Sequence, residues 1–251
     1  MSDHFATGDR AVLQAHGLDS FEALWALQLA SVDAPNTGRG GWSSVFRLEL
    51  GGTAYYLKRQ SNYLTRTLRH PFGESTFACE FRNIQRYRQL GIPTLQAAFF
   101  AERRAAGERR AILLTRALDD WQDLQAWLAR WGELDPATRA GLLQACAELA
   151  RRLHRAGQRH GCFYPKHIFL RPAGERFEAC LIDLEKTRRL LPGRADRIVD
   201  LEALTRRAGV WNEAEKRLFI ESYLAEQASE ANVDGWLGRM ASRQQSKVAR
   251  A

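Results

Sequence analysis

The chain has 251 residues, 45% of them hydrophobic, which is enough to bury one large domain or two closely packed lobes. No apolar stretch reaches the roughly 20 residues that cross a bilayer, and residues 1–10 lack the basic and apolar segments of a secretory signal, so we expect a cytoplasmic protein. The four cysteines are too widely spaced for a zinc site or a disulfide framework, and the net charge of +8 favours an anionic partner such as a nucleotide, a phosphorylated glycolipid or a nucleic acid.

The first half of the chain predicts a small β-rich lobe. The expected elements are a helix within residues 1–31, strands at 44–50 and 53–58, a helix at 75–90, and strands at 97–101 and 111–114. The first two strands alternate with period two around Gly51-Gly52, which is typical of a two-residue hairpin turn. Gly91 and Pro93 end the later helix, and we expect this lobe to span residues 1–114.

The second half predicts a mostly helical lobe over residues 119–251, joined to the first by a hinge at residues 115–118. Helical patterns cover residues 121–131, 138–156 and the region from 198 onward, and short apolar runs lie at 162–170 and 177–184. Strands followed by helices indicate an α+β fold. The basic end of the chain, which we expect to be frayed, carries Arg239, Arg243, Lys247 and Arg250.

A glycine-rich segment precedes the first predicted strand. Gly38, Gly40 and Ser43 follow the spacing G-x-G-x-x-S-x-V, close to the glycine loop that covers the ATP phosphates in protein kinases, with Ser43 at the third glycine position. An isolated glycine cluster is more often an ordinary turn. The residues that follow favour the kinase interpretation.

Lys58 closes the next predicted strand in Tyr-Tyr-Leu-Lys, as the phosphate-binding lysine of protein kinases does. The following helix carries Glu80 on its apolar side, so Glu80 is our predicted ion-pair partner for Lys58. Glu74 is nearer, but it precedes the helix in Pro-Phe-Gly-Glu, where a turn or N-terminal role is more natural. Thr115, at the predicted hinge, completes the nucleotide-binding set. For isolated Lys and Glu residues, a solvated surface position would be the ordinary interpretation.

Residues 160–167 read His-Gly-Cys-Phe-Tyr-Pro-Lys-His, the frame of the kinase catalytic loop H-R-D-x-x-x-x-N. Cys162 stands where the aspartate that orients the acceptor hydroxyl is expected. His167 stands where the magnesium-binding asparagine is expected. Taken singly, the two would be interpreted as a buried thiol and a core histidine.

Asp183 follows an apolar run in Cys-Leu-Ile-Asp-Leu-Glu, the place of the kinase aspartate that binds magnesium. The alternative is a helix cap, although an aspartate between Ile182 and Leu184 would be costly to bury without a cation or hydrogen-bond donors. We predict Asp183 and His167 as metal ligands. Asp200 resembles the aspartate that supports the catalytic loop, and we assign it a structural role.

Together these segments resemble the lipopolysaccharide kinase family, which includes InaA and the Kdo and heptose kinases of Gram-negative bacteria, and the InaA-like members most closely. The segments are Tyr55-Tyr-Leu-Lys-Arg-Gln60, Arg69-His-Pro-Phe-Gly-Glu74, Glu80-Phe-Arg-Asn-Ile-Gln-Arg-Tyr87, Gly91-Ile-Pro-Thr94, His160-Gly-Cys-Phe-Tyr-Pro-Lys-His-Ile168 and Ile182-Asp-Leu-Glu185. They span most of residues 38–205, and their combination is more specific than any one of them.

The resemblance implies a protein-kinase-like two-lobe fold, with a small antiparallel β lobe containing one main helix and a mostly helical second lobe. It also implies ATP and Mg²⁺ as cofactors, and phosphorylation of an inner-core heptose or Kdo. The partner would be the lipopolysaccharide core glycolipid, reached by peripheral contact with the cytoplasmic face of the inner membrane. We expect no nucleic acid partner, because no helix-turn-helix, zinc or aromatic RNA-binding signature is present.

Cys162 departs from the aspartate that family members with better-supported sugar kinase activity carry. Phosphoryl transfer passes through a loose transition state that requires little proton removal, so Lys58, Asp183 and Cys162 are assigned as the catalytic residues. The group that orients the acceptor hydroxyl stays open between Cys162, Glu185 and His167.

A basic segment made of Arg59, Arg66, Arg69 and His70 lies between Lys58 and the following helix. Arginine binds acidic groups through two parallel hydrogen bonds, so Arg66 and Arg69, with Glu185, are assigned to the glycolipid substrate. The alternative is a disordered, solvated loop.

Two functions compete. The first is an active sugar kinase, and the second is a pseudokinase that binds nucleotide or partners and regulates envelope or stress responses without phosphoryl transfer. A kinase acting on protein substrates is disfavoured, because the chain after Asp183 leaves little room for a large peptide-docking lobe.

Overall fold

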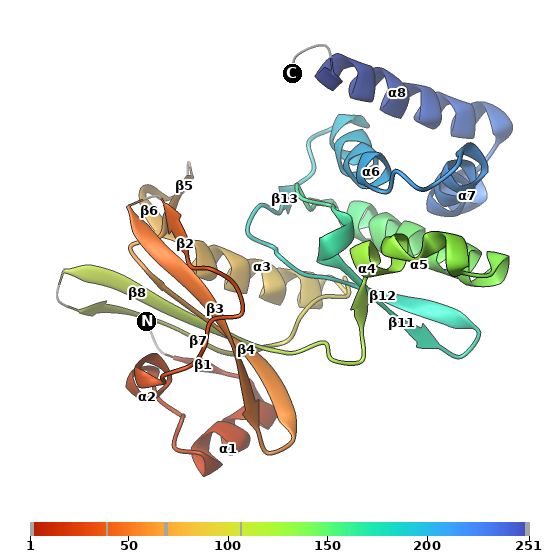
Figure 1. Cartoon of the computed structure of the whole chain (residues 1–251). Coiled ribbons are helices and arrows are strands. Elements are labelled where there is room, and N and C mark those ends of the chain that lie inside the picture. The colour runs from red at the N-terminus through yellow and green to blue at the C-terminus, as the bar shows by residue number, and fades with distance from the viewer. Residues whose placement is uncertain (1–2, 39, 68–69, 106, 249–251) are drawn as a thin grey trace. The chain divides into compact units, whose positions relative to one another are not determined.

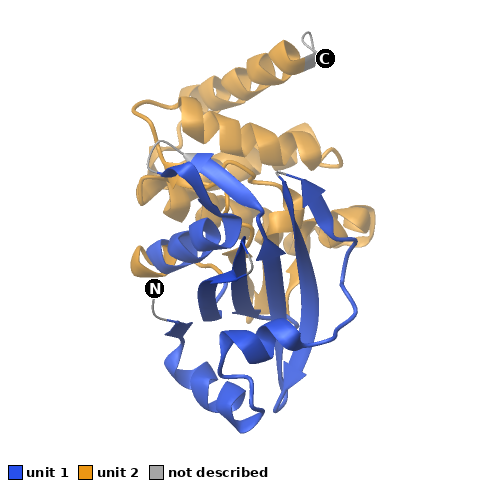
Figure 2. Ribbon diagram, turned by 90° about the vertical axis from the view of Figure 1, so that its left-hand side faces the viewer, with its two compact units in different colours: residues 1–86, 95–119 blue, residues 87–94, 120–251 orange. Residues whose placement is uncertain are grey.

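The computed structural model describes residues 3–38, 40–67, 70–105 and 107–248 (Figure 1). The chain divides into two compact units, of which unit 1 contains Met1–Arg86 and Leu95–Asp119, and unit 2 contains Tyr87–Thr94 and Asp120–Ala251 (Figure 2). Residues 87–94, which we expected in the first lobe, therefore belong to unit 2. No helix in the described ranges has both the length and the apolar character needed to span a membrane.

Unit 1 is built on a six-stranded antiparallel sheet with the order β1-β7-β8-β4-β3-β2. The strands are β1 (His4–Phe5), β2 (Asn36–Gly38), β3 (Gly41–Leu50), β4 (Thr53–Ser61), β7 (Ala97–Ala105) and β8 (Glu108–Arg116). Leu50 pairs with Thr53 around the predicted two-residue turn, where Gly51 and Gly52 both have positive φ. Strand β8 runs through Arg116, so the first two residues of the predicted hinge are strand residues.

The N-terminal region contains two short helices instead of the single helix that we expected. Helix α1 (Thr7–Ala15) ends before Gly17, whose φ is +67°, and α2 (Phe21–Ala26) begins after Ser20, whose hydroxyl accepts a hydrogen bond from Ala23 N–H. Both helices pack their apolar side chains against one face of the sheet. The shared core includes Leu13, Phe21, Leu24, Phe46, Tyr55, Leu57, Phe99 and Leu114.

Two further strands lie between β4 and helix α3 (Thr76–Gln89). A disordered, solvated loop was the alternative interpretation of this segment. Strand β5 (Leu64–Thr67) pairs with β6 (His70–Ser75) in an antiparallel hairpin. Helix α3 matches the prediction of residues 75–90 closely, because its apolar residues recur at helical spacing. Its Phe81 ring stacks on Phe100 of β7 at 4.5 Å between centroids.

Unit 2 is mostly helical, with small antiparallel sheets of β12-β11-β9 and β10-β13. Its elements are β9 (Gln122–Asp123), α4 (Leu124–Ala129), α5 (Pro136–Arg155), β10 (Gln158–Arg159), β11 (Ile168–Ala173), β12 (Arg176–Leu181), β13 (Arg188–Arg189), α6 (Ala195–Arg207), α7 (Glu213–Leu224) and α8 (Glu230–Val248). The helix expected at 121–131 is shorter, because its first residues form β9 and Trp131 begins a 3₁₀ turn.

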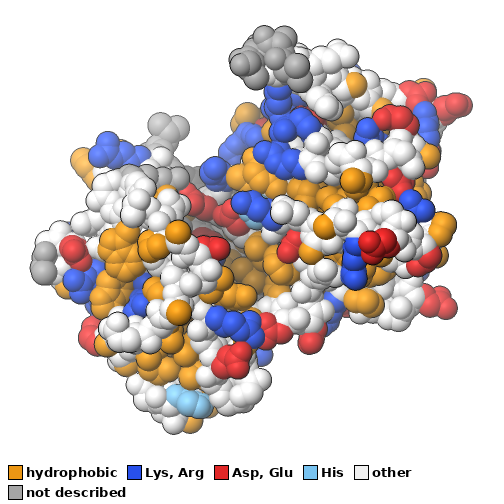
Figure 3. Space-filling view, in the orientation of Figure 1, with side chains coloured by type: hydrophobic (Ala, Val, Ile, Leu, Met, Phe, Trp, Pro, Cys, Tyr) orange, Lys and Arg blue, Asp and Glu red, His pale blue; other side chains and the backbone are white. Residues whose placement is uncertain are grey.

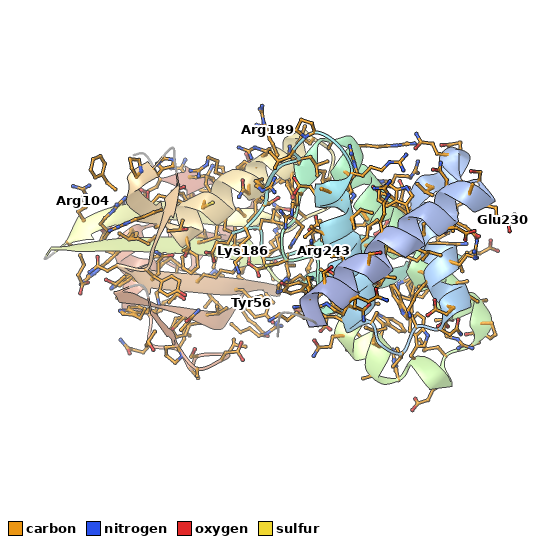
Figure 4. All side chains as sticks on the ribbon, turned by 90° about the horizontal axis from the view of Figure 1, so that it is seen from above. Tyr56, Arg104, Lys186, Arg189, Glu230 and Arg243 are labelled. Carbon is orange, nitrogen blue, oxygen red and sulfur yellow. The ribbon has the colours of Figure 1, made fainter. Side chains whose placement is uncertain are left out.

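The basic end of the chain is an ordered helix where we expected a frayed tail. Glu202 of α6 is 1% exposed and forms ion pairs with Arg206, Arg243 and Lys247, the last two from α8. Lys and Arg side chains gather near the C-terminal end of α8 in Figure 3, and Figure 4 labels Arg243 on that helix. Arg250 lies outside the described residues.

Candidate functional site

Strand β4 carries the candidate nucleotide-binding lysine. Alternate side chains of a strand point to opposite faces, and Lys58 lies on the face opposite to the buried core residue Leu57. Its Nζ lies 2.6 Å from Oε1 of Glu80 on α3. The side chains are 18% and 6% exposed, so this pair is largely withdrawn from water and its geometry is fixed by its surroundings.

Gln60, two residues further along β4, sets the start of α3. Its Oε1 accepts hydrogen bonds from the Thr76 hydroxyl at 2.7 Å and from Phe77 N–H at 3.2 Å, and its Nε2 donates to the Tyr63 carbonyl at 2.6 Å. The helix start therefore lies against the same face of the strand as Lys58. One turn further, Glu80 reaches Lys58.

The other face of β4 holds the N-terminal helices. Tyr55 donates a hydrogen bond to Asp9 at 2.8 Å, and Arg59 donates to the carbonyls of Trp25 at 2.6 Å and Leu27 at 2.8 Å. Burial lowers the pKa of Arg59. Arg59, which belongs to the basic segment predicted to contact glycolipid, therefore has a structural role in unit 1.

Glu74, the alternative partner for Lys58, is occupied elsewhere. It is buried and forms an ion pair with Arg82 at 2.8 Å, and it lies 3.6 Å from the His70 ring nitrogen. Of the predicted substrate residues in this region, Arg66 is an exposed residue of β5, whereas Arg69 lies outside the described residues.

The glycine-rich segment forms a tight turn between β2 and β3. Gly38 pairs with Gly41 across it, and Gly40 has a φ of +79°. A Cβ atom on Gly41 would lie 2.1 Å from the Ser61 carbonyl oxygen, so only glycine fits there. Sequence reasoning missed Gly41, although two consecutive glycines are a recognisable sign of close backbone approach. Ser43 lies in β3, between β2 and β4.

Thr115 is 1% exposed and lies within β8, where it pairs with Ala97 of β7 and Tyr56 of β4. It is a strand residue rather than a hinge residue. The residues predicted to bind the nucleotide therefore lie on β2, β3, β4, β8 and α3, or in the turn between β2 and β3.

In unit 2, a buried carboxylate holds the loop that follows β10. Asp200 of α6 is 1% exposed and accepts hydrogen bonds from His160 N–H at 2.8 Å and Gly161 N–H at 3.0 Å. Burial alone would raise the pKa of Asp200, but His154, His160 and the backbone N–H more than offset this and leave the pKa below its usual value. This is the supporting role that the sequence predicted.

His160 ties the loop to the segment after β12. Its Nε2 lies 3.0 Å from the Ile182 carbonyl, which can only accept, so Nε2 carries the proton. Its Nδ1 then accepts a hydrogen bond from Cys162 N–H at 3.2 Å. Burial lowers the pKa of His160, in agreement with a neutral ring. The Asp183 segment and the loop are thus held in register.

His167 and Asp183 meet in unit 2. His167 Nδ1 donates to the Cys162 carbonyl at 2.9 Å, and Nε2 lies 3.2 Å from Asp183 Oδ2. Burial lowers the pKa of His167, which favours a ring with an unprotonated Nε2. Two lone-pair-bearing atoms then face each other. Asp183 has a φ of +58° and a side chain that is 42% exposed, so its carboxylate is held in an uncommon backbone conformation at the surface of unit 2.

The His167–Asp183 pair fits a divalent cation. Within the described ranges no group of three or more His, Cys, Asp or Glu side chains is arranged to hold a metal ion. A kinase-type site needs only two protein ligands, because the nucleotide phosphates supply further oxygens. The facing Nε2 and carboxylate oxygen offer that minimal set.

Cys162 is 5% exposed, so its thiol is withdrawn into unit 2. Glu185 is half-buried, two residues after Asp183. Gly161, which replaces the arginine of the kinase pattern, has a φ of +81°, and a Cβ atom there would lie 2.9 Å from the Lys186 carbonyl oxygen. Sequence reasoning did not single out Gly161, although a glycine at a loop position that usually carries arginine was a visible departure.

The sequence from residue 22 to residue 223 matches the Lipopolysaccharide kinase (Kdo/WaaP) family. The chain belongs to this family. It is 31% identical to Protein InaA of Escherichia coli K12 over 175 residues, which cover 69% of this chain and 81% of that protein. It is 30% identical to the lipopolysaccharide core heptose(I) kinase WaaP of Pseudomonas aeruginosa over 207 residues, covering 75% of this chain and 74% of that protein.

A solved structure described as WaaP in complex with acyl carrier protein superposes with a TM-score of 0.68 at 24% identity, covering 97% of this chain and 99% of that one. The fold is therefore the α+β, protein-kinase-like fold that the sequence predicted. The family resemblance drawn from the sequence is also confirmed.

Proposed function

We propose that the protein is an ATP-dependent phosphotransferase that phosphorylates a heptose or Kdo sugar of the lipopolysaccharide core. The observation that carries the proposal is the largely buried Lys58–Glu80 ion pair between β4 and α3, since protein kinases use such a pair to hold the lysine that contacts the ATP phosphates. Membership of a lipopolysaccharide kinase family supports the class of acceptor.

The residues of unit 1 bind the nucleotide in this proposal. Lys58 contacts the α- and β-phosphates, and Glu80 keeps its ammonium group directed toward them. The turn at Gly38 and Gly40 supplies backbone N–H groups to the phosphates, since neither glycine carries a side chain. Thr115 supports this face of the sheet from within β8.

The residues of unit 2 hold the metal. His167 and Asp183 bind Mg²⁺, or Mn²⁺, which accepts an imidazole ligand more readily. A divalent ion held by these two residues would supply positive charge against the negative charge of the transferring phosphate. Asp200 maintains the loop on which His167 lies, through the N–H groups of His160 and Gly161.

In this proposal the acceptor hydroxyl is oriented without the aspartate that the kinase pattern has at position 162, where this chain carries cysteine. Because the loose transition state needs little proton removal, a group that directs the acceptor hydroxyl is sufficient. The candidates are Glu185, two residues after Asp183 in the chain, and His167, whose Nε2 lies 3.2 Å from Asp183 Oδ2, and the buried Cys162 thiol is the third. The acceptor is reached at the cytoplasmic face of the inner membrane.

The decisive experiment is phosphate transfer from labelled ATP to dephosphorylated lipopolysaccharide core, with Mg²⁺ and with Mn²⁺. Wild type is expected to transfer label, and Asp183→Asn is expected to lose transfer. A matched control is Asp234→Asn, because Asp234 lies on the exposed side of α8, paired with Arg217. Equal transfer by wild type and Asp183→Asn would contradict the assignment of Asp183.

A pseudokinase is the second candidate, and the buried thiol of Cys162 favours it. It predicts ATP binding without transfer in wild type. Cys162→Asp would restore the residue of the kinase pattern. Transfer by Cys162→Asp, combined with none by wild type, would assign the natural protein to the pseudokinase class.

A further inference from the structure

A small pocket of unit 2 is lined by residues of α5, α6, α7 and α8 and of the segments next to them. Figure 1 shows the arrangement of these four helices. Its volume is about 290 Å³, near the lower end of the range for small-molecule sites. Arginines dominate its wall, namely Arg151, Arg155, Arg194 and Arg197, with Tyr223 and Trp236 beside them. Asp183 and His167 are not among the lining residues, so this pocket is separate from the candidate metal site.

The charge of this arginine pocket is incompletely balanced. Arg151 shares Glu148 with Arg152, and Arg155 lies 3.5 Å from Glu226, a pair whose side chains are mostly exposed and hence weakly coupled. Neither glutamate lines the pocket, and no Asp or Glu does among the described residues.

Arg194 and Arg197 have no carboxylate within ion-pair distance in the part of the chain that the structure describes. Arg194 lies over the Trp236 ring, with its guanidinium carbon 5.6 Å from the ring centroid. Arg197 donates one hydrogen bond to the Gly193 carbonyl at 2.7 Å. Most of their N–H groups are thus available to a ligand, in the planar geometry that matches phosphate oxygens.

A larger pocket of unit 2 shows that this charge distribution is not general. That pocket, of about 890 Å³, also contains arginines, but Glu148, Glu175 and Glu178 line it as well. Its two signs of charge are interspersed, as on an ordinary protein surface. The arginine pocket has only one sign.

The wall of the arginine pocket is hydrogen-bonded to the candidate catalytic loop. Tyr223 Oη lies 3.0 Å from His154 Nδ1, and both residues line the pocket. His154 Nε2 lies 3.5 Å from Asp200 Oδ2, the carboxylate that holds His160 N–H and Gly161 N–H. A ligand that orders this wall acts on the residue that supports the loop.

We propose that the arginine pocket is a second binding site of this protein, which takes a phosphate group from a soluble phosphate ester or a phosphate-bearing lipid headgroup. Arg194 and Arg197 bind the phosphate oxygens, and Arg151 and Arg155 add to the positive potential. The proposal does not depend on phosphotransferase activity, because none of these residues belongs to the candidate nucleotide or metal sites.

Calorimetric titration of the whole protein with inorganic phosphate tests the site. We expect binding to wild type, and affinity weaker by at least about tenfold in the Arg194→Gln/Arg197→Gln double variant, because two charge-assisted contacts are lost. Lys58→Ala separates this from binding at the nucleotide site and is expected to retain the interaction. The charge-matched control is Arg217→Gln/Arg239→Gln, which removes two arginines of α7 and α8 that do not line the pocket.

Vesicles distinguish the two sources of phosphate. Flotation with phosphatidylcholine vesicles containing phosphatidic acid, lost in the double variant and retained in the control, would identify a lipid headgroup. Phosphate binding without flotation would identify a soluble ester. Equal affinity for phosphate in wild type and the double variant overturns the proposal, as does the absence of both phosphate binding and flotation in wild type. Thermal unfolding of each variant checks that the fold is intact, and Arg194→Lys/Arg197→Lys is expected to recover part of the affinity.

Discussion

The two candidate sites differ in how closely they follow the protein kinase pattern. In unit 1 the residue types themselves are kept, since Lys58 and Glu80 form a 2.6 Å ion pair. In unit 2 the backbone support is kept, through Asp200 and His160, while the position that carries the acceptor-orienting aspartate in the kinase pattern holds a buried cysteine, Cys162. The comparison teaches that the scaffold of a catalytic loop does not require the acidic side chain that it usually presents.

The largest expected effect is on the support of the unit 2 loop. Asp200→Ala leaves His160 N–H and Gly161 N–H without an acceptor and removes one of the two partners of the buried His154, so we expect the free energy of unfolding to fall by about 3 to 5 kcal/mol. Urea unfolding measures this. Asp234→Ala, which removes an exposed carboxylate, is the control and is expected to cost less than about 1 kcal/mol. Similar losses in the two variants would mean that Asp200 does not support the loop.

Asp196, a second carboxylate of α6, allows the stability of unit 2 to be tested through its pH dependence. Hydrogen bonds from Arg188 lower the pKa of Asp196 to about 2, and Leu191 N–H and Arg159 act in the same direction. Because the folded-state pKa lies below the unfolded value, this stabilisation is complete above about pH 4 and is lost as the pH falls through about 2.

We therefore expect Asp196→Asn to lower the free energy of unfolding by about 2 kcal/mol at pH 7. The difference in the free energy of unfolding between wild type and Asp196→Asn should shrink between about pH 4 and pH 2, because Asp196 of the wild type becomes protonated in this range. Denaturant titrations at several pH values provide the measurement. A difference that stays constant down to pH 2 would show that the Arg188 contact is not the cause.

Glycine at position 161 gives a smaller test of the loop. Gly161→Ala places a Cβ atom 2.9 Å from the Lys186 carbonyl oxygen in a residue with positive φ, and we expect a loss of about 2 kcal/mol in thermal or urea unfolding. Gly174→Ala also has positive φ, but nothing lies within 4 Å of its added Cβ atom, so its cost should be about 1 kcal/mol. Equal costs would mean that the loop moves to accept the side chain.

The smallest expected effect concerns unit 1 and uses two glutamates. Glu80→Gln removes the charge that holds Lys58, and we expect ATP affinity to fall by about tenfold. Glu74→Gln is the control, because Glu74 pairs with Arg82 and should change stability without changing ATP affinity. Calorimetric titration with ATP compares the two. A greater loss of affinity in Glu74→Gln would reverse the assignment.

Local patterns in the sequence predicted much of the fold. The Gly51-Gly52 turn and the apolar spacing of α3 depend on neighbouring residues, so their positions were predicted closely. The hairpin of β5 and β6 was missed, because it has no clear alternation. The tail was predicted as frayed, because its partner Glu202 is 45 residues from Lys247 in the chain.

The candidate sites divide in the same way. The order of the glycine turn, Lys58, Glu80 and Asp183 could be read from motif spacing, and the choice of Glu80 over Glu74 agrees with the ion pair in the structure. The arginine pocket could not be predicted, because its lining comes from four helices whose packing no local pattern specifies.

Strand β4 links several parts of unit 1 through side chains on both of its faces. Tyr55 and Arg59 hold the N-terminal helices on one face, while Lys58 and Gln60 hold α3 on the other. Inserting or deleting a single residue in this strand would move every side chain beyond the change to the opposite face and break the attachments that those side chains make. The length of β4 is therefore under stronger constraint than the identity of most of its residues. A variant with a longer or shorter β4 is expected to fail to fold, rather than to fold and lose activity.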